Sequence, residues 1–303
     1  MKKVLLSIFL LCLSLNFFGN EFNSTQNSNI INSEDRNVLN AETEQATKNK
    51  LDFRPTGSIF KLELKKDSLI LSSALLLISA DFIIQNLDHD TAMITNKLNI
   101  SEVNKIDQIL MRPYSKKLDL LGTGFELLTA ITPLFLLSTP TTEWTTIAGM
   151  YAETMLFAFG FKEFAKAIFD RPRPYMYFDN FPYEEVGSGD WNASFFSGHT
   201  TLAFAAATFT TYVFCKYKPE SKWKIPVIAT SYTLAVATAG LRILSGNHFA
   251  TDVAIGAVVG SITGLLIPFW HYVNPENPMG VIGNTDSAYL SVAPTALSFT
   301  IKM

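Results

Sequence analysis

The sequence predicts an all-α protein, a membrane-embedded bundle of about six helices, and two observations lead to this fold class. Of the 303 residues, 48% are hydrophobic and only 17% are charged, which indicates either a membrane protein or an unusually large core. The second observation is a series of apolar segments, each about as long as the roughly 20 residues that a helix needs to cross a bilayer. These segments are 68–85, 118–137, 145–169, 200–215, 225–244 and 249–273.

The N-terminal residues predict export through a bacterial inner membrane. Lys2 and Lys3 precede an apolar stretch over 4–18, as in a signal peptide. Phe17 stands where a cleavage site needs a small residue, so residues 1–19 are expected to be either a signal peptide or a retained anchor. Residues 20–60 are rich in Asn, Glu, Thr and Ser, which predicts a disordered exported linker.

A helical domain over 61–273 and a C-terminal tail over 274–303 complete the expected organisation. Between the first two apolar segments, Val103, Ile106 and Leu110 recur at helical spacing among polar residues, which predicts a short surface helix. In the tail, 274–286 is expected to be loop, and the alternation over 297–303 predicts a strand paired with 289–292.

Polar residues inside the apolar segments leave a second fold open. Asp81, Glu126 and Glu153 interrupt three of them, and the alternative is a soluble all-helical protein with a very apolar core. The formal charge of −3 gives no basic excess, so nucleic acid is not expected as a partner.

The stretch between the last two segments carries an arginine, a histidine and an aspartate within a short distance. A helix starting near His248 would place His248 and Asp252 on one face, four residues apart. The carboxylate could then accept the proton of one imidazole nitrogen and leave the other as a nucleophile or base. Arg242 would add a fixed guanidinium, a group that suits phosphate.

Two further groups of residues stand at segment ends. Pro172 disfavours helix at the preceding residue, so the third segment should end near Phe169, with Lys166 in its last turn and Arg173 beyond it. Ser197 is a plausible N-cap of the fourth segment, where Gly198 leaves backbone amides open to an anion and His199 lies on the same rim. Because the chain direction alternates from helix to helix, we expect all three groups on one face of the bundle.

Together the three groups resemble the type 2 phosphatidic acid phosphatase superfamily, which shares its core with class A acid phosphatases and vanadium haloperoxidases. The shared pattern consists of Lys166, six residues, Arg173-Pro174; then Ser197-Gly198-His199; then Arg242, five residues, His248, three residues, Asp252. The resemblance covers 118–273. Two positions depart from the pattern, because Phe196 replaces the usual Pro and Leu241 replaces the usual Ser.

The resemblance implies a phosphatase that works through a phosphohistidine. His248 would be the nucleophile, Asp252 would orient it, and His199 would protonate the leaving oxygen and later activate water. The implied phosphate ligands are Lys166, Arg173, Ser197, Gly198 and Arg242. No cofactor or metal is expected, since His199 and His248 are the only clustered histidines.

A site at helix ends beside a bilayer favours a lipid phosphate, such as phosphatidate or a prenyl diphosphate, with membrane lipids as neighbours. Three alternatives remain open: a soluble periplasmic acid phosphatase of the same fold, a vanadate-dependent haloperoxidase, and a non-catalytic membrane scaffold or transporter.

Charge in the loop between the fourth and fifth segments predicts the orientation. Its lysines lie opposite the expected site, so the positive-inside rule places the site on the exported, periplasmic face; they are Lys216, Lys218, Lys222 and Lys224. With an exported linker, three full crossings would instead bring Lys166 to the cytoplasm. One segment is therefore expected not to span, and 68–85, which contains Asp81, is the candidate.

Overall fold

The computed structural model describes residues 59–87, 97–179, 181–187 and 189–273, together with the backbone of three strands near the C-terminus. The expected signal peptide or anchor at 1–19 lies outside the described residues, as does nearly all of the linker expected at 20–60.

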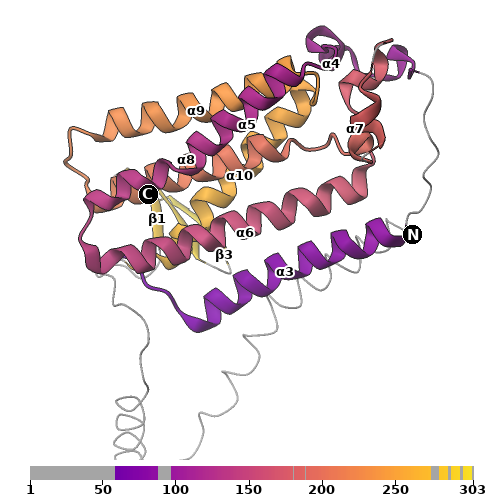
Figure 1. Ribbon diagram of the computed structural model, residues 1–303. Helices are drawn as coiled ribbons and strands as arrows, with labels where there is room; N and C mark the ends of the chain where they lie inside the picture. Colours follow the sequence, from indigo (N-terminus) through magenta and orange to yellow (C-terminus); the bar gives the residue numbers. More distant parts are fainter. Residues whose placement is uncertain are drawn as a thin grey trace, which may run out of the picture.

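All six apolar segments form helices that run side by side (Figure 1). The second continues from an α-helix into a 3-10 helix, η2 (Thr132–Ser138). The α-helices formed by these six segments are α3 (Leu64–Leu87), α5 (Lys116–Ala130), α6 (Trp144–Phe169), α8 (Gly198–Tyr217), α9 (Lys224–Leu244) and α10 (Ala250–His271). The prediction of a helical bundle is confirmed.

Among the described helices, four stretches are long and apolar enough to cross a membrane: Leu64–Ile84, Lys116–Ser138, Lys224–Leu244 and Ala250–His271. The first of these covers most of the segment that the sequence marked as non-spanning. By length and composition, α3 therefore qualifies as well as its neighbours do, and Asp81 does not disqualify it.

The outer surfaces of these helices are apolar. Large side chains remain well exposed, including Leu75 on α3, Leu120 on α5, Val236 on α9 and Val258 on α10, with exposed fractions of 62%, 64%, 58% and 54%. On α5 a shallow groove of about 640 Å³ runs along the outer face, lined by Lys117, Leu120, Leu121, Gly124, Phe125 and Leu128. Such a surface suits hydrocarbon rather than water.

A glycine stripe brings α10 close to α8, the most buried helix. A Cβ added at Gly256, Gly260 or Gly264 would lie 2.7, 2.2 or 2.3 Å from a backbone oxygen of α8 or its N-cap. Side chains at these positions would push the helices apart. The stripe therefore holds the start of α8 beside the start of α10, where two of the sequence motifs lie.

Short elements cover one end of the bundle. The predicted surface helix is α4 (Lys105–Leu110), preceded by a 3-10 turn, η1 (Ile100–Glu102). Its residues Ile106 and Ile109 are 68% and 72% exposed, whereas Asp107 is fully buried. Helix α7 (Tyr183–Gly187) and the 3-10 turns η4 (Pro174–Tyr177) and η5 (Asp190–Asn192) lie in the long connection from α6 to α8.

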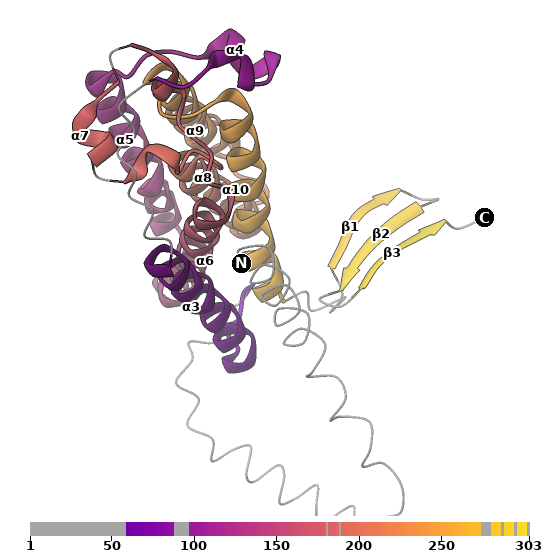
Figure 2. The ribbon, with the colours of Figure 1, turned by 90° about the vertical axis from the view of Figure 1, so that its right-hand side faces the viewer.

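Three strands follow α10 and form an antiparallel sheet in the order β1-β2-β3 (Figure 2). They are β1 (Gly280–Thr285), β2 (Ala288–Ala293) and β3 (Ala296–Ile301). The pairing expected between the last two is confirmed, with Tyr289 opposite Thr300 and Val292 opposite Leu297. The prediction of loop over 274–286 is wrong for β1. Its Gly and Asn residues have low strand propensity, and β1 is a strand because it pairs with β2.

Candidate active site

The predicted site residues all lie near one end of the bundle, where α6 and α9 end and α8 and α10 begin (Figure 1). The other end carries the start of α3 and the connection from α8 to α9 (Figure 1).

The turn from Arg242 to His248 is fixed by its own backbone and by a close neighbour. The amide of His248 donates to the carbonyl oxygen of Arg242 at 3.2 Å. Gly246 has a φ of 77°, and a Cβ there would lie 2.6 Å from the carbonyl oxygen of Arg112. Only glycine suits both conditions, and the turn thereby sets the imidazole against the connection that precedes α8.

The histidine does not lie on the helix, which corrects the expected geometry. Helix α10 begins at Ala250 with Phe249 as its N-cap, so His248 precedes it. The closest contact of His248 Nδ1 is the carbonyl oxygen of Ser194 at 2.7 Å, while Asp252 Oδ2 lies 3.9 Å away. The expectation that this carboxylate accepts the imidazole proton is therefore wrong.

Asp252 instead holds the residues around the imidazole. Its Oδ2 accepts hydrogen bonds from the hydroxyl of Ser194 at 2.6 Å and the amide of Phe249 at 2.9 Å, and its Oδ1 pairs with Arg171. Asp252 thus positions His248 through Ser194.

The surroundings of His248 define its chemical state. A carbonyl oxygen can only accept, so Nδ1 carries the proton and the lone pair is on Nε2. Burial lowers the pKa of His248 well below its ordinary value, and the positive charges of Arg173, Arg242 and Lys166 lower it further. The imidazole is consequently neutral and has a free nitrogen.

Two of the expected phosphate ligands belong to one hydrogen-bonded chain. Arg173 donates to the side-chain oxygen of Asn247 at 3.1 Å, Asn247 donates to Asp119 at 3.1 Å, and Asp119 pairs with Arg242. Arg173 also pairs with Asp190. Among the described residues, the buried Nε of Arg242 has no hydrogen-bond partner, which leaves a donor for an anion.

Lysines at the end of α6 add to this charge. Lys166 lies 3.6 Å from Glu163. The sequence analysis did not single out Lys162, which is buried with its stem over Gly198: a Cβ on that glycine would lie 2.6 Å from Lys162 Cδ. The glycine therefore makes room for a cation at the start of α8.

Ser197 takes the predicted N-cap position of α8 but not the predicted hydrogen bond. Its hydroxyl lies 2.9 Å from Thr200 Oγ1 rather than bonding a free amide of the first turn, and its own amide donates to the carbonyl oxygen of Asp252 at 3.1 Å. This backbone contact ties the first turn of α8 to the first turn of α10.

His199 is the more accessible of the two site histidines, with a side chain 33% exposed. Its Nε2 lies 3.3 Å from Thr123 Oγ1 and 3.4 Å from Glu126 Oε2, both on α5. Asp119, Thr123 and Glu126 follow one another at spacings of four and three residues, so they share a face of α5. That spacing was the signal by which Glu126 could have been found.

Residues 147–276 match the PAP2 superfamily. This part of the chain belongs to the PAP2 superfamily. The matched range covers α6 to α10, and with them all of the predicted site residues.

Individual relatives are more distant. A stretch of 73 residues is 40% identical to a lipid A 1-phosphatase of Porphyromonas gingivalis, and it covers 24% of this chain and 15% of that protein. The crystal structure of Aquifex aeolicus LpxE matches at 22% identity with a TM-score of 0.37, over 56% of this chain and 98% of that one. A PAP2-type phosphatidylglycerolphosphate phosphatase from Bacillus subtilis matches at 23% identity with a TM-score of 0.35, over 67% and 94%.

Several residues that hold the PAP2 motifs in place lie outside the matched range. Asp107 on α4 accepts hydrogen bonds from Arg171 at 2.6 Å and from the amide of Thr251 at 3.0 Å, so it links α4 to the start of α10. Asp119 and Glu126 likewise come from α5. The pattern of a single apolar segment could not place these carboxylates, because their partners are more than 60 residues away in sequence.

One of the two departures from the PAP2 pattern has a visible role. Phe196, in the usual position of Pro, is buried, and its ring packs against Phe161 of α6 with centroids 5.8 Å apart. Apolar packing thus anchors the loop before Ser197.

Proposed function

We propose that this protein is a phosphatase that hydrolyses a lipid-linked phosphomonoester or diphosphate through a phosphohistidine on His248. The observation that carries the proposal is the state of His248: a neutral imidazole, its Nδ1–H directed at Ser194, in the field of Arg173, Arg242 and Lys166. A neutral nucleophile surrounded by cations suits a substrate that is itself an anion.

In the first step, the lone pair of His248 Nε2 attacks phosphorus, and the bond from phosphorus to the leaving oxygen breaks. His199 donates a proton to that oxygen, so the lipid leaves as an alcohol or, from a diphosphate, as a monophosphate. The imidazole of His248 becomes a phosphorylated cation, which the Ser194 carbonyl and the nearby Asp252 carboxylate stabilise.

In the second step, His199 accepts a proton from water, and the resulting hydroxide attacks phosphorus. The bond from phosphorus to Nε2 breaks, phosphate leaves and His248 returns to its neutral form. Burial lowers the pKa of His199, and the positive charges of Arg242, Lys166, Lys162 and Arg173 lower it further. A bound phosphate offsets these charges, so the acid form of His199 is favoured once substrate is present, with Glu126 beside it.

The proposed phosphate ligands are Lys166, Arg173 and Arg242, together with Ser197 and Gly198 at the start of α8. A phosphomonoester carries about −1.5 to −2 charge near neutral pH, which these cations and the helix N-terminus can balance. The orphan Nε of Arg242 supplies one donor that no described protein group uses. The two steps use groups of the chain alone, and we propose that the chemistry uses no metal ion.

A lipid substrate fits the surroundings of the site better than a soluble ester does. The helices that carry the site present exposed leucines and valines to their surroundings. At the site end, α4 exposes Ile106 and Ile109 while its buried Asp107 connects to Arg171, so an apolar surface adjoins the charged centre. The relative from Porphyromonas gingivalis is named for a lipid phosphate, which supports the same substrate class. We place the protein in the bacterial inner membrane with the site on the exported side.

The test is phosphate release by the purified protein from phosphatidate, a prenyl diphosphate and a soluble ester. We expect lipid substrates to be preferred, and His248→Ala to abolish release. Preference for the soluble ester, with release from membranes by an alkaline wash, would favour the periplasmic acid phosphatase.

A trapping experiment separates the two histidines. An ester with a good leaving group, such as p-nitrophenyl phosphate, needs little proton donation, so His199→Ala should still become phosphorylated and then hydrolyse slowly. His248→Ala should show no phosphoenzyme. Equal labelling of both variants, each checked for intact folding by its thermal unfolding, would contradict a nucleophilic His248.

A further inference from the structure

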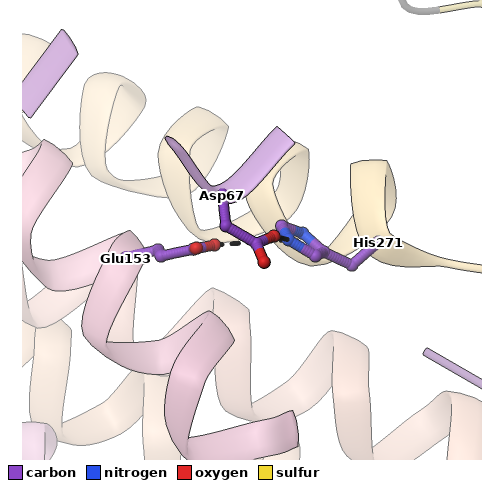
Figure 3. Close-up of side chains that lie close together, drawn as sticks. All are labelled: Asp67, Glu153 and His271. Carbon is purple, nitrogen blue, oxygen red and sulfur yellow. Dashed lines mark hydrogen bonds and ion pairs between the residues drawn. The ribbon is translucent and has the colours of Figure 1, made fainter. Parts of the chain in front are cut away.

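The end of the bundle opposite the site holds a second cluster of ionisable side chains. Asp67 in the first turns of α3, Glu153 on α6 and His271 at the end of α10 point toward one another (Figure 3). The three carry ligand atoms that all lie within 4.8 Å of one another. None of them belongs to the proposed active site.

One ring nitrogen of His271 faces both carboxylates, and the other is bonded to the backbone of its own helix. His271 Nδ1 lies 2.9 Å from the carbonyl oxygen of Ile267, which can only accept, so Nδ1 holds a proton. Nε2 then faces Asp67 Oδ1 at 3.0 Å and Glu153 Oε2 at 3.3 Å. The second ring nitrogen therefore lies between two carboxylate oxygens.

Glu153 makes this arrangement costly without a cation. Its side chain is only 5% exposed, and among the described residues its buried Oε2 has no hydrogen-bond partner. A buried carboxylate without a partner loses its hydration and gains nothing in return. Asp67 is partly satisfied, because its Oδ1 also accepts the amide of Glu63 at 3.0 Å.

We propose that Asp67, Glu153 and His271 bind a divalent transition-metal ion such as Zn²⁺. One nitrogen and two carboxylates are suitable ligands for such an ion, and metal bonds of about 2.0–2.2 Å set neighbouring ligand atoms roughly 3.0–3.5 Å apart. The observed separations of 3.0 and 3.3 Å from Nε2 meet this requirement. The hydrogen bond from Nδ1 to Ile267 orients the ring, as the second shell of a metal site does.

The ion would join α3 to the domain that carries the motifs. Helix α3 precedes the range that matches PAP2, whereas Glu153 and His271 lie within it. Neighbouring contacts already bring these ends together, since Lys66 donates to the carbonyl oxygen of Trp270 at 3.2 Å. We therefore assign the metal a structural role that is independent of phosphate hydrolysis.

The experiment uses the full chain purified in detergent, stripped with a chelator and dialysed. Titration with Zn²⁺ should give about one ion per chain by elemental analysis and should raise the unfolding temperature. Asp67→Asn and His271→Gln should each weaken Zn²⁺ binding about 10- to 100-fold or more. Glu220→Gln, which removes an exposed acid from the same end of the bundle, is the matched control and should bind as the wild type does.

Two outcomes would overturn the proposal. In the first, neither the metal content nor the unfolding temperature of the wild type responds to Zn²⁺ or to Mn²⁺, and Glu153→Gln is more stable than the wild type. The three side chains would then share a proton instead of a metal ion. The other is equal Zn²⁺ binding by the wild type and all ligand variants. His248→Ala should keep the metal while losing turnover, so failure of one proposal does not imply failure of the other.

Discussion

At the scale of single residues, the carbonyl oxygen of Ser194 determines which nitrogen of His248 can react. The imidazole donates from Nδ1 to this oxygen, and Asp252 holds Ser194 by its hydroxyl. The carboxylate therefore acts on His248, the proposed nucleophile, through an intermediate residue, and its loss should disturb the orientation of the imidazole more than proton transfer.

Replacement of Asp252 by Asn tests this positioning role. The amide can keep one hydrogen bond but loses the ion pair with Arg171, so kcat should fall about 10- to 100-fold with KM nearly unchanged. Steady-state kinetics on one lipid phosphate measures both constants, and Asp179→Asn, a change at an exposed site-end residue, is the control. A loss of about 10⁴-fold, as for a carboxylate bonded directly to a catalytic histidine, would contradict the indirect arrangement.

The depressed pKa of His248 leads to a prediction for pH dependence. Burial, followed by the charge of Arg173, lowers the pKa of His248, so the proposed nucleophile of the free enzyme stays neutral well below the ordinary histidine range. In Arg173→Gln one opposing charge is gone, the pKa of His248 rises, and the acid limb of the kcat/KM profile should move to higher pH. Arg112→Gln, also at the site end, should leave the limb in place; an unmoved limb in Arg173→Gln would contradict this electrostatic coupling.

At the scale of elements, the contact between α8 and α10 decides whether the motifs meet. The glycine stripe lets backbone approach backbone, and Ser197 bonds to the carbonyl oxygen of Asp252 at the end of that contact. We therefore expect turnover to depend on the distance between α8 and α10, although the glycines are not in the site.

Gly260→Ala should therefore damage both stability and turnover. Its new Cβ would lie 2.2 Å from the carbonyl oxygen of Thr201, and forcing such an overlap in a packed interior typically costs about 1–3 kcal/mol. The control is Gly240→Ala on α9, where a Cβ would meet nothing within 4 Å and helix propensity favours alanine by up to about 1 kcal/mol. Thermal unfolding and phosphate release should both fall in the first variant and not in the second; equal behaviour would show that the helices can separate without consequence.

The elements could be predicted from the sequence because each apolar segment carries its own signal. Pro172 marked the end of α6 at Phe169, and hydropathy marked the remaining long helices. Placement of side chains could not be predicted in the same way. Asp107 and Asp119 contact Arg171 and Arg242 across long stretches of chain, and the start of α10 two residues after His248 depends on a cap that no motif specifies.

At the scale of the whole molecule, the start of α3 and the lysine-rich loop between α8 and α9 lie at the same end of the bundle. The chain enters α3 beside the end of α10, where the amide of Lys61 donates to the carbonyl oxygen of His271 at 2.9 Å. The ring of Phe60 packs against Tyr217, at the end of α8, with centroids 5.5 Å apart. The start of α3 and the lysine-rich loop between α8 and α9 therefore face one side of the membrane, and the site faces the other. The positive-inside rule then predicts that the end with the lysine-rich loop is cytoplasmic.

A pair of fusions tests this topology. A reporter after Lys218 and a second reporter inserted directly before Ile59 should both behave as cytoplasmic, which would also correct the expectation of an exported linker. Opposite readouts would mean that α3 does not cross, and a periplasmic signal after Lys218 would place the site in the cytoplasm.

Helix α5 turns different chemistry to its two sides. On the inner side, Asp119 pairs with Arg242, and His199 lies beside Thr123 and Glu126. The groove from Lys117 to Leu128 lies on the outer side. If the substrate is a lipid, this helix is a partition between headgroup and hydrocarbon, and a bound molecule must straddle it. Exchanges on the outer face can then alter which acyl or prenyl tails are accepted while the reacting groups stay as they are.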